Sequence, residues 1–180
     1  MNRRKILLIL VTLLASAFMA VSVSAQKQLD EAHRDDHDLQ RNLVGTWLVT
    51  ATFTDPVGVP PFKVLFSFAP GRNDREGTLI DTNEFQLTPN PVCSPDQGVW
   101  ERTGSRSFIA THFNFCFDAL NMYVPAGPTK IRDTIRVSHN GETLQMRQYI
   151  EGFDTDGNLV FVGTVEGTGV RIHAEAPQAP

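Results

Sequence analysis

One carboxylate stands in this sequence where apolar side chains are expected, which makes it the first candidate for chemistry. Apolar and polar residues alternate from 131 to 150, on both sides of Asn140-Gly141. That dipeptide strongly predicts a two-residue hairpin loop. Counting outward from the loop pairs Asp133 with Gln148 on the apolar face. The other side chains predicted on this face are all apolar, namely Ile131, Ile135, Val137, Leu144, Met146 and Ile150.

Asp133 has two interpretations. In an apolar cavity its carboxyl group can hydrogen-bond a ligand or act as a general acid or base. Alternatively, Asp133 and Gln148 only satisfy each other's hydrogen bonds, or they reach water at the mouth of the cavity. The sequence alone leaves both interpretations open.

His112 is the second candidate for acid–base chemistry, because imidazole titrates near neutral pH. It lies in a hairpin whose turn is centred on Gly104-Ser105. Counting outward from that turn places Phe113 and Phe115 inside and His112 outside. We therefore expect His112 at the surface, unless a bulge reverses its strand.

Two segments have spacings that metal sites also use. His33 and His37 lie four residues apart among carboxylates, and Asp154-Thr155-Asp156 resembles the start of a calcium loop. A solvated leader explains the first better. An Asp-Gly turn explains the second, because the glutamate that would close a calcium loop is out of register. The sequence also has no catalytic Ser/His/Asp signature or phosphate loop, so we predict neither a metal nor a cofactor.

The two cysteines, Cys93 and Cys116, are predicted to form a disulfide. The register counted from Gly104-Ser105 sets them opposite each other, provided that the pairing continues past Pro95. Such a bridge stabilises the fold by roughly 3 kcal/mol through the unfolded state. The alternative is two free thiols.

Short strands joined by turns must position these residues. Alternating patterns predict strands near residues 43–53, 62–68, 77–86, 98–102, 107–117, 131–138, 143–150 and 159–172. Consecutive hairpins with almost no helix indicate an all-β fold, an antiparallel up-and-down barrel of about eight strands. Closure removes exposed edges, and a barrel of this size either packs solid or holds one small ligand.

The predicted inner face of this barrel is mostly apolar, which suits an apolar ligand. The outer face of residues 131–150 carries arginine and threonine, which suits water. We predict ligand contacts from inward-counted side chains, namely Phe66, Trp100, Phe113, Phe115, Asp133, Ile135, Met146, Gln148 and Phe161.

Composition and the first residues bear on the location of the protein. The 180 residues carry a formal net charge of −4, which gives no reason to expect a nucleic-acid partner. Residues 1–25 have the basic start, apolar run and small-residue end of a cleaved signal peptide. The mature chain then begins at Gln26, with a polar leader over residues 26–42, a barrel domain over 43–173 and a disordered tail over 174–180. We predict a secreted or periplasmic protein without membrane association after cleavage; the alternative is an uncleaved anchor helix.

A short motif in the first strand adds a resemblance. Gly45-Thr46-Trp47 resembles the Gly-X-Trp motif of lipocalins and related calycin barrels. In that superfamily an arginine late in the last strand packs across the tryptophan and closes the barrel base, and Arg171 matches that place. The resemblance implies a lipocalin-like barrel, although the Thr-Asp-Tyr motif of typical lipocalins is not in the sequence. Allene-oxide-cyclase-like barrels are a related group, suggested by architecture alone.

Three functions remain open at this point. The favoured one is a barrel that binds a small apolar molecule in its interior. The second is a cyclase or isomerase that uses Asp133 or His112 as its acid or base. The third is a solid barrel with a structural or protein-interaction role, which a measured cavity would separate from the other two.

Overall fold

The structure is a computed structural model that describes residues 43–73, 75–87, 91–118, 120 and 124–175. The predicted signal peptide, the polar leader and residues 176–180 of the tail lie outside these ranges. Within them, none of the helices has the length and apolar character needed to span a bilayer.

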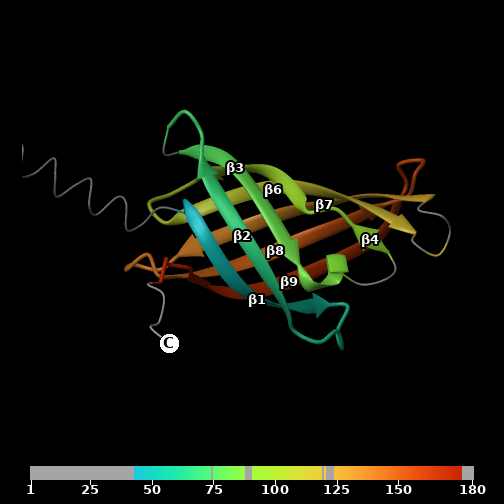
Figure 1. Ribbon diagram of the computed structural model, residues 1–180, viewed down its shortest axis with the longest axis horizontal. Coiled ribbons are helices and arrows are strands. Elements are labelled where there is room, and N and C mark those ends of the chain that lie inside the picture. Colours follow the sequence, from blue (N-terminus) through green and yellow to red (C-terminus); the bar gives the residue numbers. More distant parts are fainter. Residues whose placement is uncertain (1–42, 74, 88–90, 119, 121–123, 176–180) are drawn as a thin grey trace, which may run out of the picture. The chain divides into compact units, whose positions relative to one another are not determined.

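The described chain is a succession of β-strands (Figure 1). The strands are β1 (Gly45–Asp55), β2 (Phe62–Pro70), β3 (Glu76–Asn83), β4 (Val92–Cys93), β5 (Asp96–Arg102), β6 (Ser107–Asp118), β7 (Val124–Val137), β8 (Thr143–Phe153) and β9 (Leu159–Arg171). A short 3-10 helix, η1 (Glu84–Leu87), follows β3. Most of these strands alternate apolar and polar residues, which suits a sheet that buries one face.

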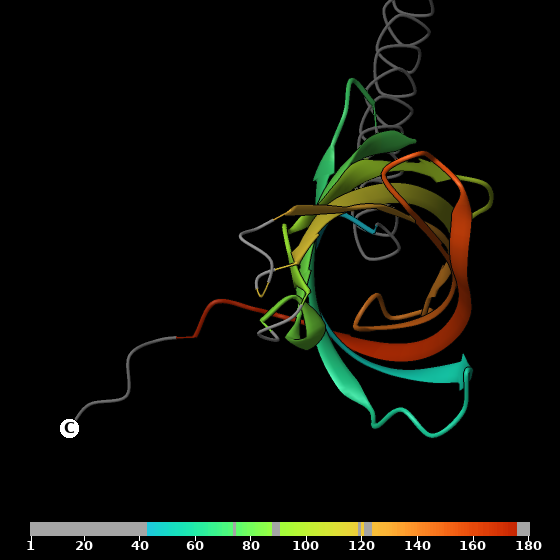
Figure 2. The same cartoon turned by 90° about the vertical axis from the view of Figure 1, so that its right-hand side faces the viewer.

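The strands close into a barrel, seen end-on as a ring in Figure 2. Neighbouring strands pair antiparallel, β9 returns to β1, and β6 pairs with β7 as well as β5. The short β4 pairs with the part of β6 beyond β5, so β4 and β5 act as one interrupted strand. The predicted antiparallel barrel of eight strands is therefore confirmed for the described residues.

The register of the β7–β8 hairpin is the one counted from Asn140-Gly141. Asp133 pairs with Gln148, and Ile135 pairs with Met146. The side chains of all four residues are buried. The Asn-Gly turn therefore predicts which residues of these two strands face the interior.

The register predicted for the β5–β6 hairpin is wrong by one residue. The Thr103 amide donates to the Ser107 carbonyl oxygen at 2.9 Å, so the loop between them has three residues instead of two. Phe108 consequently pairs with Arg102, not with Glu101. Loops of both lengths are common in hairpins, and a glycine suits either of them.

This shift exchanges the two faces of β6. His112, expected outside, is 0% exposed, whereas Phe113 and Phe115, expected inside, are 41% and 59% exposed. The reason is the two-residue period of side chains along a strand, which turns a one-residue error into a reversal of every later residue.

The predicted disulfide between Cys93 and Cys116 is confirmed, although the continuous register used to predict it is not. Cys93 pairs with Cys116, and Gln97 pairs with Phe113. Between these two pairs the chain advances four residues from β4 to β5 but only three residues along β6. The extra residue between β4 and β5 offsets the shift at the hairpin loop. The cysteines therefore lie opposite each other for a reason that simple counting missed.

One end of the barrel is closed by the contact predicted between Trp47 and Arg171. The Arg171 guanidinium lies 4.2 Å from the Trp47 ring centroid and donates from Nε to the Gly141 carbonyl oxygen at 2.8 Å. Trp47 Nε1 donates to the Leu43 carbonyl oxygen at 2.8 Å. Gly45 has φ +130°, and a Cβ there would lie 2.6 Å from Arg171 Nη1, so glycine is required.

The half of the barrel next to this base, the closed half, is packed with apolar side chains. The side chains that fill it are each at most 5% exposed. These residues are Trp47, Val49, Phe66, Phe68, Leu79, Trp100, Phe108, Ile135, Val137, Leu144 and Met146. The other half, the open half, reaches toward the loop 56–61, η1 and the disulfide.

Candidate functional site

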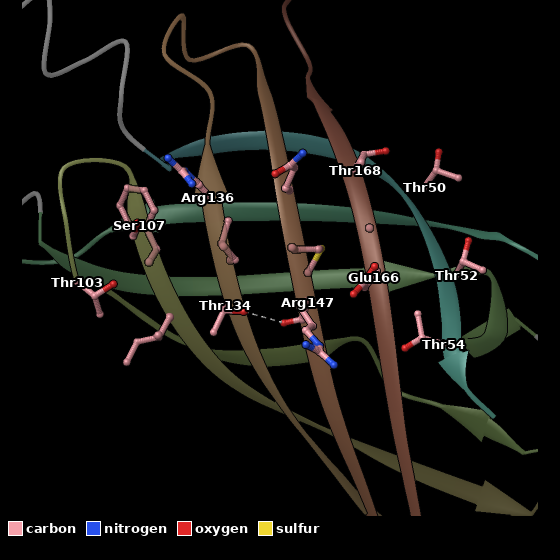
Figure 3. A pocket seen from close by; sticks show the side chains of 16 residues that line it. Thr50, Thr52, Thr54, Thr103, Ser107, Thr134, Arg136, Arg147, Glu166 and Thr168 are labelled. Atoms are coloured by element: carbon pink, nitrogen blue, oxygen red, sulfur yellow. Dashed lines mark hydrogen bonds between the residues drawn. The ribbon is translucent and has the colours of Figure 1, made fainter. Parts of the chain in front are cut away.

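A broad hollow of about 920 Å³ lies on the outside of the barrel (Figure 3). It crosses β6, β7, β8, β9 and β1, and its lining includes the exposed side chains of Thr52, Arg147 and Glu166. These side chains are hydrated in the free protein, so they gain little by turning from water to a ligand. The outer hollow is therefore the weaker candidate.

The stronger candidate is a pocket of about 330 Å³ inside the open half. Its walls are mainly apolar and include Phe53, Val59, Phe62, Val64, Phe85, Ile131, Ile150 and Phe161. Seven polar residues also line it, namely Asp81, Asn83, Gln86, Asp96, Asn114, Thr129 and Gln148. An apolar enclosure with a few convergent polar groups is the usual form of a small-molecule site.

Three of these residues, Asp81, Asp96 and Gln148, belong to a layer that separates this pocket from the closed half. Five neighbouring strands each contribute one residue that is at most 5% exposed. These residues, which we name the polar layer, are Asp81 on β3, Asp96 on β5, His112 on β6, Asp133 on β7 and Gln148 on β8. Buried charged groups need ion-pair or hydrogen-bond partners, and the residues of the polar layer act as partners for one another.

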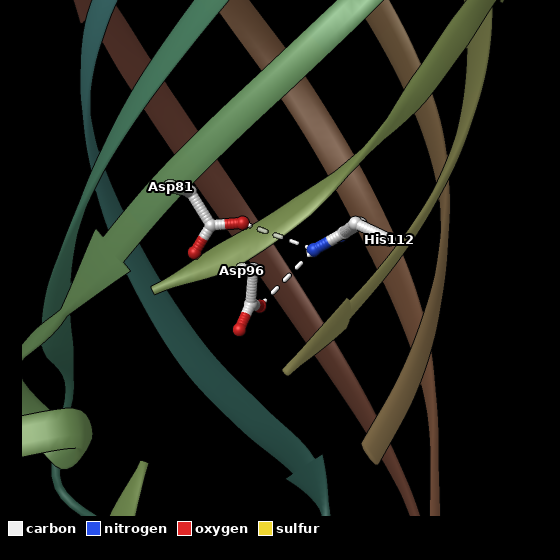
Figure 4. Close-up of side chains that lie close together, drawn as sticks. All are labelled: Asp81, Asp96 and His112. Carbon is white, nitrogen blue, oxygen red and sulfur yellow. Dashed lines mark hydrogen bonds and ion pairs between the residues drawn. The ribbon is translucent and has the colours of Figure 1, made fainter. Parts of the chain in front are cut away.

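His112 is the centre of the polar layer, and Figure 4 shows its side chain facing Asp81 and Asp96. Its Nδ1 lies 3.0 Å from Asp81 Oδ2 and 3.1 Å from Asp96 Oδ2, and its Nε2 lies 3.0 Å from Asp133 Oδ2. Burial lowers the pKa of His112, but the charge of Asp133 and the close polar contacts with the three carboxylates raise it well above its usual value. A Cβ on Gly98, opposite His112, would lie 2.5 Å from His112 Cβ, so this glycine lets β6 approach β5 closely at His112.

Asp81 is the least satisfied member of the layer. A protonated Nδ1 carries one hydrogen, and that hydrogen points at Asp96 Oδ2. Asp81 Oδ2 is equally near to Nδ1 but accepts no hydrogen bond, although it is buried. Burial raises the pKa of Asp81 to about 7, while its contact with His112 acts in the opposite direction.

Two amide side chains orient the other carboxylates. Gln86 Nε2 donates to Asp96 Oδ1 at 3.0 Å, and Gln148 Nε2 donates to Asp133 Oδ1 at 3.1 Å. Gln86 is itself placed by η1, because Asn83 Oδ1 accepts the Gln86 backbone N–H at 3.2 Å. Both Oδ2 atoms are thereby left to face His112.

The residues predicted to contact a ligand fall into three groups. Gln148 and Phe161 line the interior pocket, and Asp133 lies in the polar layer beneath it. Four others are buried in the closed half, namely Phe66, Trp100, Ile135 and Met146. Phe113 and Phe115 face outward, so their predicted place inside the barrel is wrong. Contact of the inward residues with a ligand stays a prediction.

Sequence reasoning missed Asp81 and Asp96 and misplaced His112. Strand alternation could have found the two carboxylates, because Asp81 has the parity of buried Leu79, and Asp96 has the parity of buried Trp100. His112 could not be placed without the length of the hairpin loop before β6. The polar layer is therefore partly visible in the sequence and partly a result of the turn.

The fold and the pocket together define a class, an antiparallel barrel of eight strands with a pocket in one half. Among solved structures, the chain of EF1p2_mFAP2b bound to DFHBI is similar, with a TM-score of 0.51 and 15% sequence identity. The match covers 76% of this chain and 98% of that chain, and at this identity it shows the fold alone. No family model matches the chain, and no curated protein matches it in sequence.

Proposed function

We propose that this protein is an extracytoplasmic barrel that holds one small, mainly apolar molecule in its interior pocket. The observation that carries the proposal is the pocket itself, about 330 Å³ in volume, with apolar walls and polar groups at one end. This volume is at the lower end of the range for small-molecule sites. The pocket also argues against a barrel that is filled with side chains throughout.

The chemistry of the walls and floor constrains the molecule. Phe62, Ile131 and Ile150 favour an apolar body, because burial of apolar surface is the main gain on binding. The carboxylates of Asp81 and Asp96 are hydrogen-bond acceptors, so a hydroxyl or N–H group on the ligand would suit the floor. The similar barrel EF1p2_mFAP2b is bound to DFHBI, which supports binding of a small molecule by a barrel of this fold.

The location and the wider relationship are part of the proposal. A signal peptide over residues 1–25 would export the chain, and the Cys93–Cys116 disulfide suits an oxidising compartment. The Trp47–Arg171 contact supports a relationship to lipocalin-like barrels. Sequencing of the exported protein should find Gln26 as its first residue; retention of Met1 would contradict cleavage and favour an uncleaved anchor helix.

A dye titration tests the pocket. N-phenyl-1-naphthylamine, a neutral apolar dye, should bind one site per chain with a saturable rise in fluorescence. Thr129→Trp places a large ring in the pocket and should weaken binding about tenfold or more. Thr134→Trp is the matched control on the same strand, because Thr134 faces outward and lines the outer hollow. Loss of binding in Thr134→Trp but not in Thr129→Trp would place the dye outside the barrel.

Acid–base chemistry in the same pocket is the second candidate function, as in a cyclase or isomerase. The observation that favours it is that carboxylates line an apolar pocket, where a bound substrate would touch them. Asp81 and Asp96 are better placed for this than His112, whose two ring nitrogens both face carboxylates. Native mass spectrometry of the exported protein should identify a retained molecule. Conversion of that molecule by the wild type, with binding but no conversion in Asp81→Asn, would favour the enzyme.

A further inference from the structure

Three potential metal-ligand atoms converge at the floor of the interior pocket (Figure 4). They are His112 Nδ1, Asp81 Oδ2 and Asp96 Oδ2, and they all lie within 4.8 Å of one another. The nitrogen is 3.0 Å from the first oxygen and 3.1 Å from the second. Two ligand atoms at right angles on a cation with bonds of about 2.1 Å are about 3.0 Å apart. The spacing therefore fits a shared cation.

Hydrogen bonding explains only one of these two contacts. Nδ1 has at most one hydrogen, and that hydrogen is directed at Asp96. Asp81 Oδ2 is left without a hydrogen bond in a side chain that is 2% exposed. A buried oxygen that accepts no hydrogen bond costs free energy, so Asp81 Oδ2 has room for a partner in addition to its ion-pair contact with His112.

The surroundings of His112 are those of a metal-binding histidine. Its other nitrogen, Nε2, faces Asp133 Oδ2 at 3.0 Å, and Asp133 is held in turn by Gln148. Metal-binding histidines usually donate their second ring N–H to a carboxylate, which fixes the tautomer and orients the ring. The Gln86 bond to Asp96 Oδ1 likewise leaves Oδ2 of that residue for the shared point.

We propose that Asp81, Asp96 and His112 bind one divalent transition-metal cation at the floor of the pocket. One imidazole and two carboxylates suit Zn²⁺, Fe²⁺ or Mn²⁺ better than Ca²⁺, which takes six to eight oxygen ligands as a rule. Because Asp81 and Asp96 line the pocket, the remaining coordination positions face the bound molecule. The inference goes beyond apolar ligand binding and does not depend on it, and it departs from the metal-free site expected from the sequence.

Calorimetry with Zn²⁺ on the full exported chain, stripped with a chelator, tests the site. We expect one Zn²⁺ per chain for the wild type. Asp133→Asn should weaken binding about 10- to 100-fold through the orientation of His112, and Asp81→Asn should weaken it by at least about 100-fold. His173→Gln is the control, because His173 pairs with Glu142 at 2.7 Å on the surface and should not matter.

Two outcomes would overturn the inference, namely no stoichiometric binding, or equal affinity in the wild type and Asp81→Asn. Circular dichroism checks that Asp81→Asn is folded. If it is not, X-ray absorption of Zn²⁺-loaded wild type decides: one imidazole with oxygen ligands supports the site, and two or more imidazoles contradict it. The dye titration is run on the metal-free protein, so failure of the metal proposal would not contradict the proposed apolar pocket. Failure of dye binding would likewise not contradict the metal site.

Discussion

The two halves of the barrel contain similar apolar side chains, but these side chains pack against one another in one half and line a pocket in the other. In the closed half, Trp47, Phe108 and their neighbours pack against one another beneath the Arg171 contact. In the open half, Phe62 and Ile150 face a pocket of about 330 Å³. Burial against protein atoms gains dispersion contacts that a hollow forgoes. The closed half is therefore expected to carry most of the stability, and the open half contains the candidate site.

The polar layer marks the boundary between the two halves. Removal of an imidazole and three carboxylates from water is costly, and apolar residues of the same size are often at least as stabilising. Stability alone therefore does not account for His112 and its three partners. Their position directly under the pocket agrees with the proposed binding of a small molecule and a cation there.

Trp47→Ala should give the largest loss of stability. Trp47 is fully buried and contacts Arg171 at the base, so the variant should lose about 4 kcal/mol of unfolding free energy. Urea unfolding followed by circular dichroism measures the loss. A loss below about 1 kcal/mol would show that the closed half is not where the stability lies.

The double variant Cys93→Ser, Cys116→Ser should lose about 3 kcal/mol, because the bridge spans a sequence separation of 23 residues. This loss acts through the unfolded chain and needs no contact in the closed half. Reductant added to the wild type should shift the urea midpoint by a similar amount. Equal stability with and without the bridge would remove the disulfide from the account.

Asp81→Asn should change how stability depends on pH in the metal-free protein. The pKa of Asp81 is raised from 3.8 to about 7, so the folded chain binds this proton more tightly than the unfolded chain. Asp81 therefore lowers stability as pH rises from 3.8 to about 7, while Asp96, Asp133 and His112 face it. The unfolding free energy of the variant minus that of the wild type should therefore be larger near neutral pH than in mild acid. Urea midpoints in chelator at the two pH values test this, and an unchanged difference would contradict it.

Phe85→Ala should have the smallest effect on stability. Phe85 lies on η1 at the wall of the pocket, 39% exposed, with its ring 4.6 Å from that of Phe62. We expect a loss of about 1 kcal/mol but a clear change in dye affinity. Trp47→Ala should show the opposite result in the same two measurements, a large loss of stability with little change in dye affinity. If the two variants changed stability and dye affinity in the same proportion, the distinction between the halves would be contradicted.

The sequence predicts the β7–β8 hairpin well and the β5–β6 hairpin poorly, for a physical reason. Asn140-Gly141 strongly favours a two-residue loop, whereas Thr103-Gly104-Ser105-Arg106 suits loops of two or three residues. The inward place of Asp133 follows from the first turn, and the misplacement of His112 follows from the second. Convergence of side chains from β3, β5 and β6 depends on the pairing of β3 with β5, which sets Asp81 opposite Asp96, and on the register of β5 with β6. Local patterns do not contain either of them.

A methyl-resolved NMR titration with N-phenyl-1-naphthylamine tests the division of the barrel most directly. We predict saturable shifts for Val64, Ile131 and Ile150 around the pocket, with Leu144 and Val137 in the closed half unchanged. Saturable shifts confined to the closed half, or to residues around the outer hollow such as Ile109, would contradict the account.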